Sequence, residues 1–209
     1  SVSYNNKIKF PHLTLLVTGG HTQIYLTEQN QNILLLGETL DDALGEAFDK
    51  VAKILGLPYP GGKEIEKNAQ NGDEDFFQLP QPKSNSNNID FSFSGIKTAV
   101  NLIVKKNKLD SSLINNVSAS FQKCVAEILK NKLNIALIKL KKQGTNVRSF
   151  SLVGGVANNN YIKLKLSELK DKFKIDMILP PNEMMSDNAA MIAWATIRKY
   201  NKSEMDINF

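Results

Sequence analysis

The sequence has few of the residues that build disulfide frameworks and metal cages. Its 209 residues include one cysteine, Cys124, and two histidines, His12 and His21. One cysteine excludes an intramolecular disulfide framework, and two histidines exclude a histidine-rich metal cage made by this chain alone. Cys124 lies on the apolar side of a helical pattern, which favours a buried structural thiol over a nucleophile.

Long apolar runs and several catalytic signatures are absent too. No apolar run reaches the roughly 18 residues of a membrane span, and the first residues do not form a signal peptide. There is no Walker loop, no His-Glu-x-x-His and no Gly-x-Ser-x-Gly motif. We therefore expect a soluble protein of a reducing compartment with no membrane partner. That compartment is the cytoplasm or, in a eukaryote, the mitochondrial matrix.

The chain is mildly basic. It has 26 Lys and Arg against 21 Asp and Glu, which gives a net charge of +5 and a pI near 9.1. Such a surplus suits an anionic partner such as a nucleic acid or a nucleotide. Most of the lysines fall in helical patterns, where they also fit a solvated helix face. The charge alone leaves both interpretations open.

Apolar periodicity predicts an α/β fold with a mixed sheet. Three antiparallel strands come first, then a helix, a helical insertion at about 62–110, and parallel β-α units. We expect strands or extended segments within 13–26 (two strands), 32–36, 90–94, 149–153 and 176–179, and helices over 40–55, 62–69, 96–105, 111–142, 159–173 and 187–200. This order is that of the ribonuclease-H-like unit, which actin-like ATPases and sugar kinases use twice per chain and which appears here about once.

Two glycine pairs follow apolar strands. Gly19 and Gly20 lie in the run Thr-Gly-Gly-His-Thr over 18–22, and Gly154-Gly155 opens the run Gly-Gly-Val-Ala-Asn-Asn-Asn over 154–160. Glycine lets the backbone approach a ligand closely, and amides at a turn or a helix N-terminus favour anionic oxygens. Ordinary hairpin and strand-to-helix turns explain each pair alone, but two pairs in one fold favour a nucleotide site.

Carboxylates cluster at two predicted helix starts. Asp42, Glu46 and Asp49 recur at helical spacing, so that neighbouring carboxylates form pairs on one helix face. Paired carboxylates can bind a metal, ribose hydroxyls or an amine, and the alternative is that they are solvated charges of the helix surface. Asp187 follows Ser186 at the last predicted helix, where it is either a cap residue or a metal ligand. One carboxylate cannot hold a metal alone, so further ligands would have to come from elsewhere.

The motifs together resemble one family. The ordered set at 18–22, 37–50, 59–62, 90–98, 154–159 and 186–193 is similar to that of the tRNA threonylcarbamoyltransferase (TsaD) family, over nearly the whole chain. The resemblance implies a two-lobed, actin-like (ASKHA) fold. It also implies transfer of threonylcarbamoyl from threonylcarbamoyl-AMP to N6 of adenosine 37, in tRNAs that read codons beginning with A.

The resemblance also assigns residues and partners. It places the substrate at Leu16, Val17, Thr18, Gly19, Gly20, Asp49, Gly62 and Asn159, with Thr18 where the family usually has Ser, and it makes Asp187 a ligand of a divalent metal, iron in the family, with zinc or magnesium as alternatives. No catalytic residue is assigned. The expected partners are tRNA, a non-catalytic paralogue and a small ATPase. The Lys-rich run over 130–142 is a candidate surface for tRNA or a partner, although a solvated helix face explains it more simply.

Departures from the family pattern leave two alternatives. The family's histidine metal ligands, its first lobe and its Arg- and Trp-containing tail have no counterpart, and the chain starts with Ser almost directly in a strand. We therefore expect residues 1–209 to be the C-terminal lobe, lacking the N-terminal lobe and inactive when alone. The alternatives are a non-catalytic partner subunit or decayed fragment of the same fold, and an actin-like small-molecule kinase.

Overall fold

A five-stranded mixed sheet forms the centre of the protein. The computed structural model describes residues 8–30, 32–81, 87–181, 184–185 and 189–202. The strands lie in the order β3-β2-β1-β4-β5, with bounds β1 (His12–Val17), β2 (Thr22–Thr27), β3 (Ile33–Glu38), β4 (Ser149–Val153) and β5 (Asp176–Ile178). β1 pairs antiparallel with β2 and parallel with β4. This topology confirms the predicted ribonuclease-H-like order of strands.

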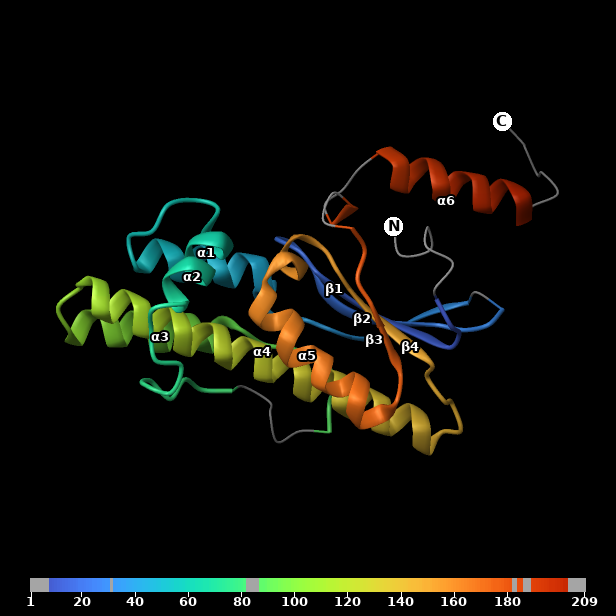
Figure 1. Cartoon of the computed structure of the whole chain (residues 1–209), viewed down its shortest axis with the longest axis horizontal. Coiled ribbons are helices and arrows are strands. Elements are labelled where there is room, and N and C mark those ends of the chain that lie inside the picture. Colours follow the sequence, from blue (N-terminus) through green and yellow to red (C-terminus); the bar gives the residue numbers. More distant parts are fainter. Residues whose placement is uncertain (1–7, 31, 82–86, 182–183, 186–188, 203–209) are drawn as a thin grey trace.

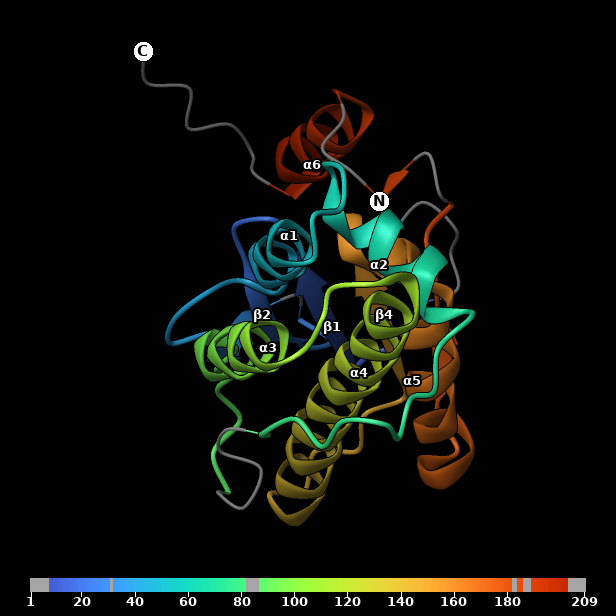
Figure 2. The ribbon, with the colours of Figure 1, turned by 90° about the vertical axis from the view of Figure 1, so that its left-hand side faces the viewer.

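Helices cover the sheet unequally. The helical elements are α1 (Leu44–Ile54), α2 (Gly61–Ala69), α3 (Ser94–Lys106), α4 (Ser111–Lys142), the 3-10 helix η2 (Gly155–Asn158), α5 (Asn160–Phe173) and α6 (Ala189–Lys202). Figures 1 and 2 show α4 and α5 on one side of the sheet and α6 on the other, with α1 and α2 gathered at one end. None of the described helices is long and apolar enough to cross a membrane.

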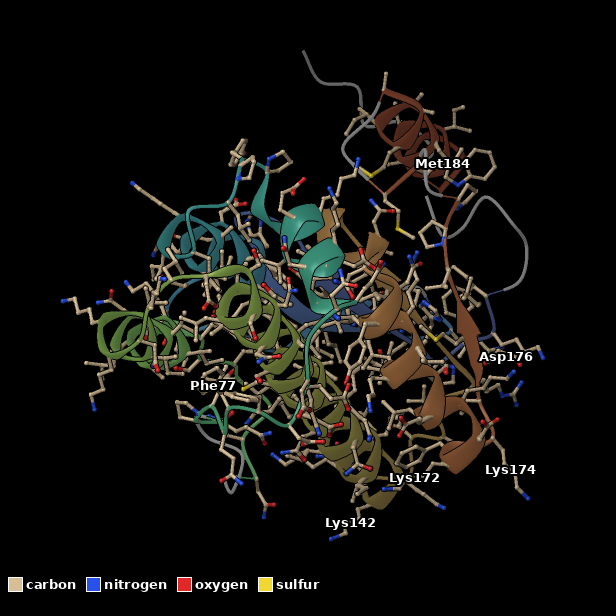
Figure 3. The ribbon with its side chains drawn as sticks, turned by 60° about the vertical axis from the view of Figure 1, so that its left-hand side comes forward. Phe77, Lys142, Lys172, Lys174, Asp176 and Met184 are labelled. Carbon is tan, nitrogen blue, oxygen red and sulfur yellow. The ribbon has the colours of Figure 1, made fainter. Side chains whose placement is uncertain are left out.

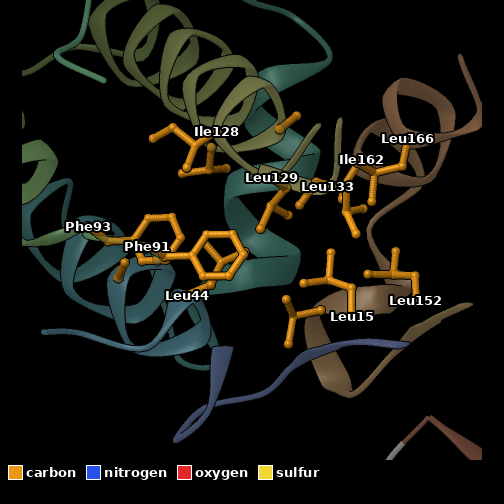
Figure 4. Close-up of a cluster of buried hydrophobic side chains, with 14 of the residues drawn as sticks. Leu15, Leu44, Phe91, Phe93, Ile128, Leu129, Leu133, Leu152, Ile162 and Leu166 are labelled. Carbon is orange, nitrogen blue, oxygen red and sulfur yellow. The ribbon is translucent and has the colours of Figure 1, made fainter. Parts of the chain in front are cut away.

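The core lies between the sheet and α4. Alternate residues of β1 point toward α4 and are fully buried, as the two-residue period of a strand requires. Figure 4 shows Leu15 and Leu152 from the sheet beside Leu129 and Leu133 of α4. Phe91 and Phe93 are both fully buried and stack on each other. Cys124 is buried as well, as predicted for a structural thiol.

Two predicted elements differ from those observed, for a common reason. The helix expected from residue 40 begins at Leu44, and the extended segment expected over 90–94 makes only one bridge, between Thr39 and Phe91. The Asp41 carboxylate accepts hydrogen bonds from the backbone and side chain of Ser94 and from the Ser92 hydroxyl. These bonds hold residue 41 outside α1 and draw the segment after residue 91 into the first turn of α3.

The domain boundaries are not decided by this fold. The insertion at about 62–110 and the assignment of the chain to one lobe of a two-lobed protein stay predictions.

Candidate functional site

The two glycine pairs meet at one edge of the sheet. β1 and β4 are parallel neighbours, so the turn after β1 and η2 after β4 emerge side by side at the carboxyl ends of these strands. Ligands of open α/β sheets bind in the crevice at this edge. The sequence therefore predicted correctly that both motifs follow strands, and the parallel pairing brings them together.

The turn after β1 is held by its own threonine. The Thr18 hydroxyl accepts hydrogen bonds from the amides of Gly20 (3.2 Å) and His21 (2.9 Å), and the Thr18 amide donates to the His21 carbonyl (2.8 Å). Two of the amides that the sequence offered for anionic oxygens are thus used within the turn. A ligand at this turn meets the exposed backbone around Gly19 instead.

Helix α1 begins directly against this turn. The Leu44 amide donates to the hydroxyl of Thr22 (2.8 Å), and the Gly45 amide donates to the Thr18 carbonyl (3.1 Å). A Cβ at Gly45 would lie 2.7 Å from that carbonyl oxygen and 2.8 Å from the Cα of Gly19. Only glycine permits this approach, so Gly45 fixes the start of α1 on the wall of the site.

Gly154 plays a similar part for η2. Its φ of +104° is accessible almost only to glycine, and a Cβ there would lie 2.2 Å from the carbonyl oxygen of Val17. The backbone of residue 154 therefore crosses directly over the end of β1. A Cβ at Gly155, by contrast, would meet nothing within 4 Å, so this glycine faces open space.

The third wall comes from α1 and α2. Asp49 of α1 accepts a hydrogen bond through Oδ1 from the Gly61 amide (2.8 Å), which ties α1 to the first turn of α2. A carboxylate at a helix N-terminus is favoured by the helix dipole. The bond uses one oxygen of Asp49 and also fixes the segment from Tyr59 to Gly62 at the mouth of the site.

A cavity of about 600 Å³ lies between these walls. This volume is in the usual range for small-molecule sites. It is lined by Gly19, Gly45, Phe48, Asp49, Tyr59, Pro60, Gly62, Lys63, Glu66, Gly155, Val156, Asn158 and Asn159. Four of the predicted substrate residues, Gly19, Asp49, Gly62 and Asn159, are among them. Four motif segments far apart in the sequence thus form a single cavity.

The other predicted substrate residues lie beside this cavity rather than in its lining. Leu16 and Val17 end β1, and Val17 is fully buried in the core. Thr18 and Gly20 belong to the turn, where the Thr18 hydroxyl is already hydrogen-bonded. These four residues shape the wall behind Gly19, and their contact with substrate stays a prediction.

The Asn159 side chain has two hydrogen-bond partners within the protein, which the sequence did not reveal. Its Oδ1 accepts from the Ile162 amide (2.9 Å), and its Nδ2 donates to Oε1 of Gln122 in α4 (2.8 Å). The residue is 6% exposed and is the N-cap of α5. Its side chain therefore anchors the start of α5 to α4 and holds the η2 segment in place at the cavity.

The carboxylate cluster on α1 divides into two parts. Lys50 forms ion pairs with Asp42 (2.6 Å) and Glu46 (2.8 Å). The hydrogen bonds that its ammonium group donates, chiefly to Asp42 and secondly to Glu46, raise the pKa of Lys50. Asp42 and Glu46 thus bind the amine of a side chain of this protein rather than the amine of a ligand. Asp49 alone of the three lines the cavity.

The predicted metal ligand Asp187 lies outside the described residues. Within the described part of the chain, no group of three or more His, Cys, Asp and Glu side chains is placed to hold a metal ion. His12 is buried in β1 and His21 is exposed on the turn, so the histidines do not form a pair. The residues that the structure describes therefore do not make a complete metal site.

Sequence reasoning did not assign Lys63 or Glu66 to the site, and it included Tyr59 and Asn158 only as members of motifs. Tyr59 is 84% exposed at the cavity mouth, and Glu66 accepts the Asn160 amide through Oε1 (2.7 Å), which links α2 to the start of α5. The helix predicted from residue 62 did contain a pattern that could have identified Lys63 and Glu66. Gly62, Lys63 and Glu66 share one face at spacings of three and four, directly after a glycine turn.

Sequence comparison places this site among known proteins. A family model described as TsaD: tRNA N6-adenosine threonylcarbamoyltransferase matches residues 1–194. The tRNA N6-adenosine threonylcarbamoyltransferase of Thermosipho africanus (strain TCF52B) is 48% identical over 204 residues, which are 95% of this chain and 60% of that protein. The protein of the same name from Wolbachia pipientis wMel is 42% identical over 205 residues, again 60% of its length. The chain thus spans about three-fifths of these relatives.

Structural comparison agrees on the fold. Full-length HypF in its phosphate- and nucleotide-bound form superposes with a TM-score of 0.66 at 12% identity, over 96% of this chain and 34% of that one. The activator of 2-hydroxyisocaproyl-CoA dehydratase from Clostridium difficile, with bound ADPNP, gives a TM-score of 0.50 at 17% identity, over 97% and 66% of the two chains. At these identities the likeness concerns the fold alone, and it confirms the predicted actin-like class.

Proposed function

The chain belongs to the tRNA N6-adenosine threonylcarbamoyltransferase family, and we propose that the protein transfers threonylcarbamoyl from threonylcarbamoyl-AMP to N6 of adenosine 37 in tRNA. The observation that carries the proposal is the cavity of about 600 Å³, in which four of the family's motif segments converge. Its volume suits an acyl-nucleotide, and the open glycines at positions 19, 62 and 155 let a ligand approach the backbone.

The chemistry that the site must supply is modest, because the substrate is already activated. Threonylcarbamoyl-AMP is a mixed anhydride. The adenosine amine attacks the carbamoyl carbon, the bond from that carbon to the phosphate oxygen breaks, AMP leaves, and the amine loses a proton. The site has to align the two substrates and stabilise the oxyanion that develops.

The cavity residues match parts of this task. Asp49 and Glu66 each have one carboxylate oxygen bonded to a backbone amide, and each has a second oxygen that we assign to ribose hydroxyls. The ammonium group of Lys63 is the cation of the cavity wall and suits the phosphate of the adenylate. The glycine backbone at 19 and 155 allows the carbamoyl group to lie close to the ends of β1 and β4.

A metal ion, if bound, would supply Lewis-acid polarisation of the carbonyl oxygen. Asp187 is the ligand that we propose from this chain, with iron, zinc or magnesium as the ion. A non-catalytic paralogue, a small ATPase and a cytoplasmic or mitochondrial location remain predictions of the same kind.

The proposal is tested by transfer of labelled threonylcarbamoyl to tRNA by the complete protein. Glu66→Gln should raise KM for threonylcarbamoyl-AMP about tenfold, because a neutral amide accepts a ribose hydroxyl less strongly than a carboxylate does. The matched control is Glu64→Gln, which changes a carboxylate of the same helix that does not line the cavity. Absence of any transfer by the unaltered protein, or equal effects of the two variants, would overturn the assignment.

A further inference from the structure

A second cavity lies at the opposite edge of the sheet, surrounded by cations. It has a volume of about 620 Å³ and lies where β4 and β5 begin and α4 and α5 end. We call its five cationic side chains the basic edge: Lys9, Lys141, Arg148, Lys172 and Lys174. Figure 3 shows Lys172 and Lys174 here at the end of α5, with Lys142 at the end of α4 close by.

The basic edge has far more positive than negative charge. Asp176 is the one carboxylate that lines the cavity, and its Oδ2 is paired with the ammonium of Lys9 at 2.7 Å. Lys172 donates to a neutral amide, Oδ1 of Asn134, at 2.8 Å. Among the described residues, Lys141, Arg148 and Lys174 form no ion pair within 4.0 Å. Five cations against one carboxylate leave four positive charges in excess around one concave surface.

Stabilisation of the helices accounts for only part of this charge. Cations in the last turns of α4 and α5 complement the negative ends of the helix dipoles, which explains Lys141 and Lys172. Arg148 precedes β4 and has no such role. Lys174 has a φ of +54°, a conformation that glycine adopts more readily, so the backbone gives no reason for a lysine there.

Helix α5 connects the basic edge to the candidate site. Asn159 caps its first turn at the cavity of the site, and Lys172 lies in its last turn. Thirteen residues separate these two, so the distance along the helix is about 20 Å. Double-stranded DNA carries one phosphate charge per roughly 1.7 Å of axis and an RNA stem is at least as densely charged, so on the order of ten phosphates fall within this span. An RNA stem that continues from a loop nucleotide bound in the candidate site would run along α5 and reach the basic edge.

We propose that the basic edge binds the phosphate backbone of the tRNA substrate, about 20 Å from the nucleotide that reacts. The inference rests on the proposed function and extends it, because it gives tRNA a second contact outside the reaction site. A folded RNA fits better than a free phosphate. The cations surround a wide concave surface, and among the described residues that line it no charged side chain is buried so as to enclose a single small anion.

The test compares two triple variants of the complete protein. In the first, Lys141, Arg148 and Lys174 are changed to Gln. In the control, Lys105, Lys106 and Lys108 at the end of α3, which are exposed and outside this cavity, are changed to Gln. Both variants lose three positive charges. tRNA affinity is measured over a series of salt concentrations, together with binding of AMP as a probe of the candidate site and the thermal midpoint as a check on folding.

The basic-edge variant should bind tRNA about 10- to 100-fold more weakly near 0.1 M salt. Its slope of log affinity against log salt should be shallower by about 2, since each lost phosphate contact removes roughly 0.7 to 0.9. AMP binding should be unchanged in both variants, and the control should keep the full slope. If tRNA binds but the two variants weaken it equally or not at all, the inference fails and the proposed function stands. If the unaltered protein does not bind tRNA, both fail.

Discussion

A histidine inside the sheet should make the protein sensitive to mild acid. His12 in β1 is 2% exposed, and its ring lies between the hydroxyls of Ser149 (2.7 Å from Nδ1) and Ser151 (2.8 Å from Nε2). The Ser149 hydroxyl donates to the carbonyl of Lys9, so Nδ1 donates to Ser149 and Nε2 accepts from Ser151. Burial lowers the pKa of His12 from 6.5 to about 4, against an opposing contribution from Ser149, so the ring is neutral in the fold.

The magnitude follows from that shift. Between pH 6.5 and pH 4 the unfolded chain binds a proton at His12 and the folded chain does not, so the free energy of unfolding falls as the pH falls. The difference between 6.5 and about 4, at about 1.4 kcal/mol per pKa unit, amounts to about 3.5 kcal/mol in full, of which about 3 kcal/mol is lost by pH 4. The contribution is complete above pH 6.5 and is lost on the way to pH 4. A domain stable by about 5 to 15 kcal/mol would show this loss clearly.

Urea unfolding followed by circular dichroism from pH 7 to pH 4 measures the effect. His12→Gln retains an amide that can bond both serines but does not titrate. The variant should be less stable at pH 7 and should lose about 3 kcal/mol less than the native protein on acidification. His21→Gln, which removes the other imidazole from an exposed turn, is the control and should follow the native profile. Parallel profiles for the native protein and His12→Gln would refute the reasoning.

Three further predictions concern stability and reactivity. Gly154→Ala should lower the free energy of unfolding, measured in urea, by more than about 2 kcal/mol, because φ at this position is +104° and the new Cβ would collide with the Val17 carbonyl. Gly155→Ala is the control and should be nearly neutral, because a Cβ there meets nothing within 4 Å. Equal effects of the two variants would contradict this account. Asp41→Asn should cost about 1 kcal/mol in the same assay, because the exposed carboxylate would lose charge-assisted hydrogen bonds from Ser92, Phe93 and Ser94; an unchanged midpoint would argue against this role of Asp41. Cys124 should react with iodoacetamide only on unfolding, because burial raises its pKa to about 12, and rapid labelling of the native protein, followed by mass spectrometry, would contradict this.

The sequence predicted the strands well because their signal is local. The apolar run of β1, the alternation in β2 and the largely apolar run of β4 require no knowledge of distant residues, and the long series of apolar residues at helical spacing gave the bounds of α4, 111–142, correctly. The start of α1 was predicted too early because Asp41 is held by residues more than 50 positions away. Hydrogen bonds between residues so far apart in the sequence cannot be predicted from a local pattern.

The site was predicted less completely, for a physical reason of the same kind. The glycine pairs were found, but the hydrogen bonds of Thr18 and Asn159 depend on geometry that a motif does not encode. Residue type alone suggested that these groups face a ligand. In the fold their polar atoms are bonded to the protein, and the cavity is completed by Tyr59 and Glu66 from the neighbouring turn and helix.

The bond between Asn159 and Gln122 has a consequence for how the chain can change in length. Each residue of an α-helix turns the following ones by 100°. Inserting or deleting one residue early in α4 would therefore rotate Gln122 away from Asn159, and with it Lys123 away from its partners Glu74 and Asp75. We expect α4 to accept substitutions at its exposed positions but no insertion or deletion before residue 122.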